Sequence, residues 1–499
     1  MKQFLLFAAA AVIAGAAMAQ NEQIHVFRND KTFNSYKGAD VESITYSGGT
    51  DGYTKMILTD AANKTTTIDM SVVDSVVVRS TGLPEIHVTL TEHPELKDLP
   101  KGYSSELNDG IYYTKSTVHP ATLYIDGNGM IDDLEEQTVE FRGRGNSTWN
   151  MAKTPYRFKM GSKKSIGGMK KAKTFALIAN YIDCTLMRNT VALWVANYLG
   201  LPYSNHCVPV VVYLNGNYKG QYMMTEKIGI GGGSVDIDEL KGMLFELDSN
   251  YDEDYRFTFN LNNYTTAQPY GSPLSNKQVL PVMVKDPDLT EITVDLGVSA
   301  DEYFATWKSD FANMAKAVMS TPTSGSLKDY LDLESVVRYF IVNSVANNHE
   351  MKHPKSLYIH KDSLGGVYKF GPVWDFDWAF TYDGNEYASA TVPLVSGNGD
   401  CGGYAFVKKL FQNEELRKLY KERWDEFVTT GYPEMLSYME NYATTIEPSA
   451  KENGLLWTGD SSRNTVSTFE FRKNFETLKA WIQQRVNYCN SHKNYGLFE

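Results

Sequence analysis

The sequence has few of the features that assign a protein to a class at once. Its four cysteines in 499 residues are too few and too scattered for a disulfide framework or a paired-cysteine zinc site. Basic residues are outnumbered, with 48 Lys and Arg against 60 Asp and Glu, and the net charge of −12 argues against a general nucleic-acid binder. No GxxxxGK-S/T stretch occurs, which excludes a P-loop. Because 42% of the residues are hydrophobic, we expect a folded protein with a large core.

Long apolar runs are absent beyond the first twenty residues, so we expect no membrane span. Lys2 precedes an apolar run over residues 5–17, and Ala17-Met18-Ala19 offers a small-residue cleavage site. This pattern predicts a signal peptide over residues 1–19 and a secreted or periplasmic protein. No cysteine directly follows the cleavage site, so we expect no lipid anchor there. A buried N-terminal helix is the alternative, but the run has no polar face.

The remaining chain divides into three stretches of different character. Residues 20–82 contain a weak internal repeat of short β-rich runs, which predicts a small β-rich module. Residues 83–228 are rich in strand patterns and include a hairpin signal at Asn215-Gly216. Residues 229–499 are mostly helical in pattern, apart from an Asn-, Asp-, Pro- and Tyr-rich stretch at about 248–326 that we interpret as an irregular insertion. The whole predicts an α+β fold with a strand-rich and a helical lobe.

A stretch without acidic residues is the most informative feature of the sequence. Between Phe141 and Ile182 there are ten basic residues and no Asp or Glu. Glycines are interleaved with them, and Arg157 and Lys159 would share one face of a strand. Arginine forks match phosphate oxygens, and glycines let backbone N–H groups approach an anion. The stretch therefore favours a phosphate-rich ligand, with a solvated basic face or a polyanion-docking surface as the alternative.

Two carboxylates stand two residues apart in Trp374-Asp375-Phe376-Asp377. Hard cations such as Mg²⁺ prefer carboxylate oxygens together with substrate phosphates. In an extended backbone both carboxylates would share a face and could approach one ion, whereas in a turn they would diverge and only one would be a ligand. A turn-forming or capping Asp pair is the alternative interpretation.

The segment His349-Glu350-Met351-Lys352-His353 matches the HExxH pattern of zinc metalloproteases. In a helix the two histidines would lie one turn apart and could hold Zn²⁺. Pro354 disfavours the helical conformation at His353, and no third ligand is evident. We therefore regard a zinc metalloprotease as the least favoured of the functions considered.

Taken together, several motifs in order resemble the spore coat protein H (CotH) kinase family over about residues 83–378. They are Phe141-Arg-Gly-Arg-Gly-Asn-Ser-Thr-Trp149, Lys153-Thr-Pro-Tyr-Arg-Phe-Lys159, Asn180-Tyr-Ile-Asp183 with Arg188-Asn189, Leu214-Asn-Gly-Asn-Tyr-Lys-Gly220 with Thr225-Glu226, Asn347-Asn-His-Glu350, and Trp374-Asp-Phe-Asp377. Several motifs in order are more specific than any one of them. The module at residues 20–82 lies outside the resemblance.

The resemblance implies an atypical protein kinase with a two-lobed kinase-like fold, which uses ATP and Mg²⁺ or Mn²⁺ to phosphorylate a protein acceptor. It implies a domain over residues 83–499, with a strand-rich lobe over 83–228. Asp375 would hold the metal, and Asp377 and Ser356 are further candidate ligands. Glu350 and Asp375 are the candidate catalytic residues. The candidate nucleotide-binding residues are Arg142, Arg144, Asn146, Ser147, Lys153, Arg157, Lys159 and Glu226.

The sequence departs from the family pattern at the catalytic positions. Family members commonly carry an Asp as base and a metal-binding Asn a few residues on, and here the corresponding places are Glu350 and Lys355 or Ser356. Glu accepts a proton but reaches about one methylene further, and Ser is a weaker metal ligand. We therefore carry two hypotheses, an exported protein kinase and a non-catalytic surface or envelope binding protein on the same scaffold. They differ in whether Glu350 and Asp375 converge on the basic stretch.

Overall fold

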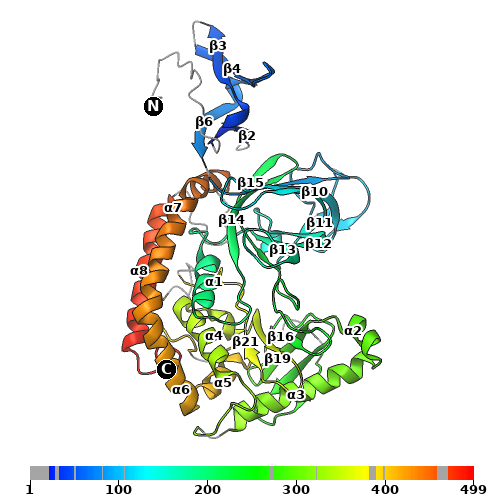
Figure 1. Ribbon diagram of the computed structural model, residues 1–499, viewed down its shortest axis with the longest axis vertical. Coiled ribbons are helices and arrows are strands. Elements are labelled where there is room, and N and C mark those ends of the chain that lie inside the picture. The colour runs from blue at the N-terminus through cyan, green and yellow to red at the C-terminus, as the bar shows by residue number, and fades with distance from the viewer. Residues whose placement is uncertain are drawn as a thin grey trace.

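We describe the chain from a computed structural model (Figure 1). It describes residues 22–498 except 29–32, 50–51, 81, 106, 270, 272–273, 322, 381–388, 397–398 and 458–469. The signal peptide predicted at 1–19 therefore lies outside the described residues. None of the described helices is both long and apolar enough to cross a membrane.

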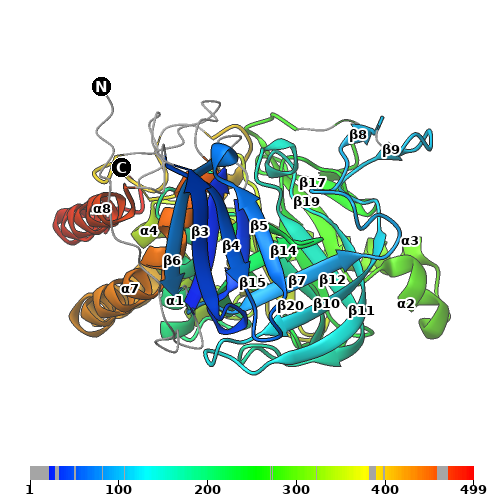
Figure 2. The same ribbon diagram turned by 90° about the horizontal axis from the view of Figure 1, so that it is seen from above.

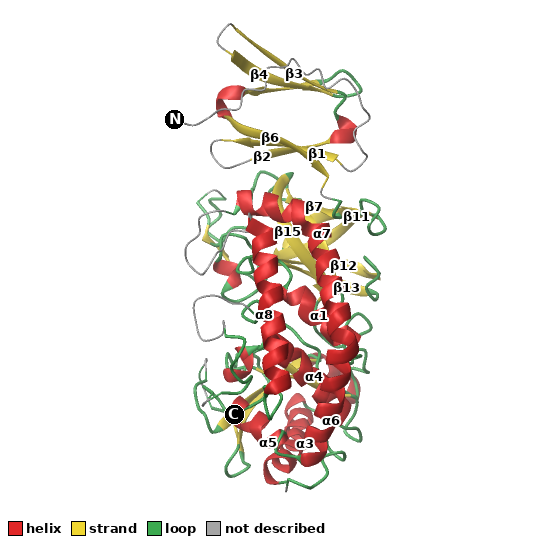
Figure 3. Ribbon diagram, turned by 90° about the vertical axis from the view of Figure 1, so that its left-hand side faces the viewer, coloured by secondary structure: helices red, strands yellow, loops and turns green. Residues whose placement is uncertain are grey.

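Residues 22–80 form two three-stranded antiparallel sheets that enclose a small apolar core (Figure 3). One sheet has the order β2-β1-β6 and the other β3-β4-β5. Each sequence repeat folds as two strands, a short 3₁₀ turn and a third strand that joins the sheet of the other repeat. The strands are β1 (Glu22–Arg28), β2 (Phe33–Lys37), β3 (Ser43–Gly49), β4 (Gly52–Thr59), β5 (Thr65–Asp69) and β6 (Val73–Ser80).

The next part of the chain is a closed barrel with the strand order β10-β11-β12-β13-β15-β14-β7. Apolar side chains alternate along its strands and fill the interior, as in β12, where Tyr156, Phe158 and Met160 are buried. The sequence-predicted hairpin is β14–β15, joined at Asn215-Gly216. The strands are β7 (Glu85–Leu90), β10 (His119–Asp126), β11 (Leu134–Gly143), β12 (Tyr156–Lys164), β13 (Ala172–Ile178), β14 (Cys207–Leu214) and β15 (Asn217–Glu226); β8 (Gly102–Tyr103) and β9 (Tyr112–Tyr113) form a separate ribbon.

A six-stranded sheet with the order β18-β17-β19-β16-β20-β21 lies below the barrel, with helices packed around it (Figure 1). The prediction of a simply helical stretch over 229–499 is therefore incomplete, because strands distant in sequence pair with one another here. The elements are β16 (Met243–Leu247), β17 (Arg256–Asn260), β18 (Thr266–Ala267), β19 (Val279–Asp286), β20 (Leu357–Lys361), β21 (Lys369–Phe370), α2 (Leu289–Leu296), α3 (Ala300–Ser320), α4 (Leu333–Ala346) and α5 (Gly403–Leu410).

The prediction of an irregular insertion at 248–326 is wrong. Strands β17 and β19 and helices α2 and α3 occupy most of it. Helix α3 begins with a capping box between Ser299 and Glu302. Its buried stripe includes Phe304, Trp307 and Phe311, which pack on the sheet through ring contacts such as that of Phe311 with Phe245 at 5.0 Å. The Asn- and Pro-rich composition reflects the turns between these elements.

Four further helices connect the two parts. Helix α1 (Arg188–Tyr198) lies between the barrel and α4. The long helices α7 (Tyr432–Leu456) and α8 (Phe471–Ser491) run side by side along both parts, and α6 (Glu414–Glu426) precedes α7 (Figures 1 and 3). Seen from above, the small module stands over the barrel and the helix pair (Figure 2). This packing fixes the barrel against the six-stranded sheet, and the candidate site lies between them.

Candidate functional site

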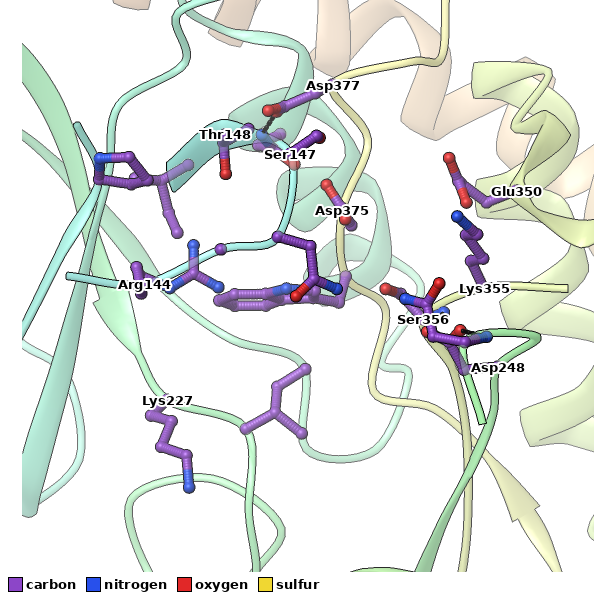
Figure 4. A pocket seen from close by; sticks show the side chains of 18 of the residues that line it. Arg144, Ser147, Thr148, Lys227, Asp248, Glu350, Lys355, Ser356, Asp375 and Asp377 are labelled. Carbon is purple, nitrogen blue, oxygen red and sulfur yellow. Dashed lines mark hydrogen bonds between the residues drawn. The ribbon is translucent and has the colours of Figure 1, made fainter. Parts of the chain in front are cut away.

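A cleft of about 1000 Å³ separates the barrel from the six-stranded sheet. This volume is at the upper end of the range of about 300–1,000 Å³ for small-molecule sites. Residues from both sides line it, including the turn after β11, the end of β15, the loop after β16 and the Trp374–Trp378 segment. Figure 4 shows Asp375 between Arg144 and Lys227 on one side and Glu350, Lys355, Ser356 and Asp248 on the other.

The barrel contributes a tight turn between β11 and β12. A Cβ atom at Gly143 would lie 1.9 Å from the ring of Trp149, so only glycine lets that indole pack beneath the turn. Gly145 has a φ of +84°, a left-handed conformation that favours glycine. The Arg144 N–H donates to the carbonyl of Pro155 at 3.1 Å and ties the turn to the start of β12. The turn thus presents Arg144, Asn146 and Ser147 to the cleft in a fixed geometry.

Positive charge gathers on the barrel side of the cleft. Arg142 and Arg157 are register partners on β11 and β12, and both line the cleft with Arg144. Burial and the neighbouring Arg142 and Arg144 lower the pKa of Arg157 to about 10. Burial, followed by Arg157, lowers the pKa of Lys227. Positive charges that lower the pKa of neighbouring cations in this way favour the binding of an anion between them.

The Trp374–Asp377 segment forms the opposite wall and is bent. Asp375 has a φ of 65°, which is rare for a residue with a side chain and occurs most often at functional sites. Its carboxylate is exposed to the cleft, and no hydrogen bond or ion pair engages it within the described residues. Loss of hydration between the cleft walls raises the pKa of Asp375, whereas Arg144 and Lys355 oppose the rise. The carboxylate is therefore available to a ligand.

Asp377 is held differently, so the two carboxylates diverge as expected for a turn. It is buried, and its side chain accepts a hydrogen bond from the Asn189 amide, which also accepts the N–H of Phe376 at 2.8 Å. Arg188 donates to the backbone carbonyl of Asp377 at 2.9 Å. Burial, then Asp375 and Asp183, raises the pKa of Asp377 to about 7. The start of α1 thus fixes the bent segment and leaves Asp375 as the open carboxylate.

Glu350, Lys355, Ser356 and Asp248 lie across the cleft from the arginines. Glu350 belongs to the 3₁₀ helix His349–Lys352, and its carbonyl accepts the Lys355 N–H at 2.9 Å. Burial, then Asp375, raises the pKa of Glu350 to about 8, while Lys355 lowers it. Ser356 has a φ of 51°, and its N–H donates to Asp248 at 3.3 Å. Burial, then Glu246, raises the pKa of Asp248 to about 7. This wall therefore holds carboxylates that take up protons near neutral pH.

A sequence model of the family described as CotH kinase protein matches residues 141–489. The match covers more than two thirds of the chain. The chain belongs to this family. A search among curated proteins found no match. The small module and the first two strands of the barrel, β7 and β10, precede the matched residues, whereas every cleft residue discussed above lies within them.

Most of the residues implied by the CotH resemblance line this one cleft. They are Arg142, Arg144, Asn146, Ser147, Arg157, Glu350, Ser356, Asp375 and Asp377. The structure also gives a role to the motif at Asn180–Asp183 and Arg188-Asn189. Asp183 accepts the N–H of Arg188 at 2.8 Å, and Asn180 accepts the Asn189 amide at 3.0 Å. The motif therefore holds the start of α1 against the Asp377 segment.

Three implied nucleotide-binding residues lie outside the cleft. Lys153 is fully buried, and its ammonium donates to the backbone carbonyls of Ala179 and Gln221. Lys159 lies two residues further along β12 than Arg157, about 7 Å away, and pairs with Glu140 at 3.7 Å. Glu226 is buried, accepts the His206 N–H at 2.9 Å and does not line the cleft. These three side chains therefore do not line the cleft that holds the other candidate residues.

Several cleft residues were not named individually as candidates from the sequence, although the CotH resemblance implies a hinge at Glu226 and its neighbours. Lys227 and Ile228, which directly follow Glu226, line the cleft in its place. Asp248 directly follows the buried strand β16. A charged residue at the end of an apolar strand was the sequence signal that could have identified it. Lys285 on β19 donates to Glu246 and Glu253, at 2.8 and 2.9 Å. Burial opposes its charge, but these two carboxylates outweigh burial and raise the pKa of Lys285.

The HExxH segment does not form the helix that a zinc site needs. It is a 3₁₀ helix, and the imidazole of His353 lies 2.7 Å from Asp400. Among the described residues, no group of three His, Cys, Asp or Glu side chains is placed to hold a metal ion. Oxygen donors such as Asp375 still suit Mg²⁺, which is commonly bound by one or two carboxylates plus substrate phosphates. The residues present fit that mode of binding rather than an all-protein metal cage.

Proposed function

We propose that this protein is an atypical protein kinase that transfers the terminal phosphate of ATP to hydroxyl groups of a protein acceptor. One observation carries the proposal: the arginines of the barrel wall and the open carboxylate of Asp375 face each other across one cleft, with Glu350 beside them. Family membership supports the same conclusion. The barrel and the part built on the six-stranded sheet would be the two lobes of a kinase-like fold.

In this proposal the barrel wall binds the triphosphate. Arg144 and Arg157 would donate charge-assisted hydrogen bonds to phosphate oxygens, and the turn with Gly143 and Gly145 lets the backbone approach them. The segment after β15, Lys227 and Ile228, would meet the nucleoside. Mg²⁺ or Mn²⁺, when bound, would neutralise charge that develops on the phosphates. Asp375 would hold that ion, with Asp377 and Ser356 as further candidate oxygen ligands.

Glu350 would act as the general base. Its carboxylate takes the proton of the acceptor hydroxyl, the hydroxyl oxygen forms a bond to the terminal phosphorus, and the bond from that phosphorus to the leaving ADP breaks. A base whose pKa is about 8 holds this proton well at neutral pH. The fraction of deprotonated Glu350 then limits the rate below that pH, and Lys355 increases the fraction by lowering the pKa.

Binding and transfer can be tested on the whole mature chain. Thermal unfolding of the protein should shift upward with ATP and shift further with ATP plus Mg²⁺. Labelled phosphate from the terminal position of ATP should appear on the protein itself or on dephosphorylated casein, and should be absent with Asp375→Asn. If the protein binds a sulfated polymer but does not bind ATP with or without Mg²⁺, the result would instead support a non-catalytic surface-binding protein. Export remains part of the proposal and is tested by N-terminal sequencing of the natural protein, which should begin at Gln20.

A further inference from the structure

The side chains of Arg144 and Trp374 form a contact between the two walls of the cleft. The guanidinium carbon of Arg144 lies 5.3 Å from the ring centroid of Trp374, within the distance of a cation–π contact (Figure 4 shows Arg144). Arg144 belongs to the turn of the barrel, whereas Trp374 directly precedes Asp375. The indole also packs on an apolar cluster that includes Ile228, Leu244 and Tyr358. The position of the indole is therefore set by this apolar cluster rather than by Arg144.

The donors of Arg144 are unused in the described part of the chain. No hydrogen bond or ion pair engages its guanidinium there, and Asp375 attracts it only at longer range. An arginine has five N–H donors in a planar fork. When a ring face holds that plane, the in-plane donors stay free for a bidentate anion. By contrast, Arg142 donates to the carbonyl of Ser116 at 3.4 Å.

We propose that Trp374 is a positioning residue that holds Arg144 ready for the polyphosphate of the substrate and couples the turn of the barrel to the Asp375 segment. This inference rests on the proposed function. It identifies the polyphosphate, rather than the adenine, as the part of ATP whose binding depends on Trp374. The contacts support one another: the apolar cluster holds the indole and the indole holds the guanidinium. The phosphate oxygens then meet donors that need little reordering.

The test is a double-mutant cycle with two probes, ATP and inorganic tripolyphosphate, measured by calorimetry on the full mature chain without added metal. Trp374→Leu should weaken both probes by the same factor, about 2- to 30-fold, which corresponds to the range of a cation–π contact. Trp374→Phe should lose less, because a ring face remains. In an Arg144→Met background, Trp374→Leu should cause almost no further loss. Trp194→Phe, an aromatic residue outside the cleft, serves as control and should change neither affinity.

Several outcomes would overturn the inference. If the affinity losses of the two variants add in the cycle, Trp374 acts only through general stability. If Trp374→Leu weakens the binding of ATP but not of tripolyphosphate, the indole contacts the adenine. If Trp374→Leu fails to fold, the cycle is run with Trp374→Phe, whose loss should likewise disappear in the Arg144→Met background. A wild-type protein that binds neither probe overturns both this inference and the proposed kinase. Binding and phosphate transfer with an additive cycle overturn this inference alone.

Discussion

The two walls of the cleft differ in secondary structure and carry opposite charge. The barrel wall is a regular sheet with one tight turn, and its cleft residues from Lys115 to Ile228 include no acidic side chain. The opposite wall combines strand residues with loops, has left-handed backbone at Asp375 and Ser356, and supplies Asp248, Glu350, Asp375 and Asp377. The regular wall suits the binding of a fixed anion, whereas the bent wall suits carboxylates whose proton affinity is tuned by burial.

The largest expected effect is on the bent wall. Asp375→Asn should reduce phosphate transfer to background, a loss of at least about 10³-fold, because it removes the open carboxylate that faces the phosphates. The thermal shift with ATP alone should remain, since the arginines stay in place, whereas the further shift with Mg²⁺ should disappear. An Asp375→Asn protein with the full Mg²⁺-dependent shift would transfer the metal role to Asp377.

The next effect concerns the proton. Glu350→Gln should lower the rate of transfer by about 10²-fold through loss of the base, with little change in ATP affinity. In the wild type, the rate should rise with pH up to about 8, because the base must be deprotonated. Lys355→Met should move this rise to higher pH, since Lys355 lowers the pKa of Glu350. Lys352→Met, from the same segment but outside the cleft, is the control. A flat pH profile would remove Glu350 from the mechanism.

These roles show which parts of the site were predictable from the sequence. The run of residues without acidic side chains predicted the three arginines of the barrel wall, and the Trp374–Asp377 motif predicted the open carboxylate of the opposite wall. Local patterns predicted the hairpin β14–β15 because its signal lies in adjacent residues. The six-stranded sheet escaped prediction because β16 pairs with β19 and β20, and no local pattern encodes such distant partners. Helix α3 was an avoidable miss, since its capping box and apolar stripe are visible in the sequence.

Periodicity also predicts a face without predicting how far along it a site extends. Arg157 and Lys159 share the outer face of β12, as the alternation indicates. Only the structure shows that Arg157 pairs with Arg142 at the cleft end of the barrel, whereas Lys159 pairs with Glu140 one step further away. Lys153 begins the motif that ends at Lys159, but the burial of its ammonium depends on carbonyls from β15 and from the residue after β13. Such partners are set by tertiary packing.

This distinction gives a prediction of intermediate size for the basic wall. Arg157→Met should weaken ATP binding by about 10- to 150-fold, the value of a lost charge-assisted contact to phosphate. Lys159→Met on the same strand face should change it by less than about 3-fold, because its partner is Glu140 in solvent. Calorimetric titration of both variants at two salt concentrations makes the comparison. Equal small losses that fade with salt would favour a polyanion surface over a nucleotide cleft.

The smallest effect is on stability, and it has opposite signs at two glutamates. Burial raises the pKa of Glu350 from 4.5 to about 8, so the folded chain holds this proton more tightly than the unfolded chain. Stability is therefore lost as the pH rises from about 4.5 to about 8. Glu350→Gln should remove this loss and raise the melting temperature at pH 8 by a few degrees. Glu447 is the control, because hydrogen bonds from Lys451 and Arg472 lower its pKa, although burial opposes this. Glu447→Gln should lower the melting temperature at the same pH, and equal shifts in both variants would contradict the assignment of Glu350 to a buried, proton-holding site.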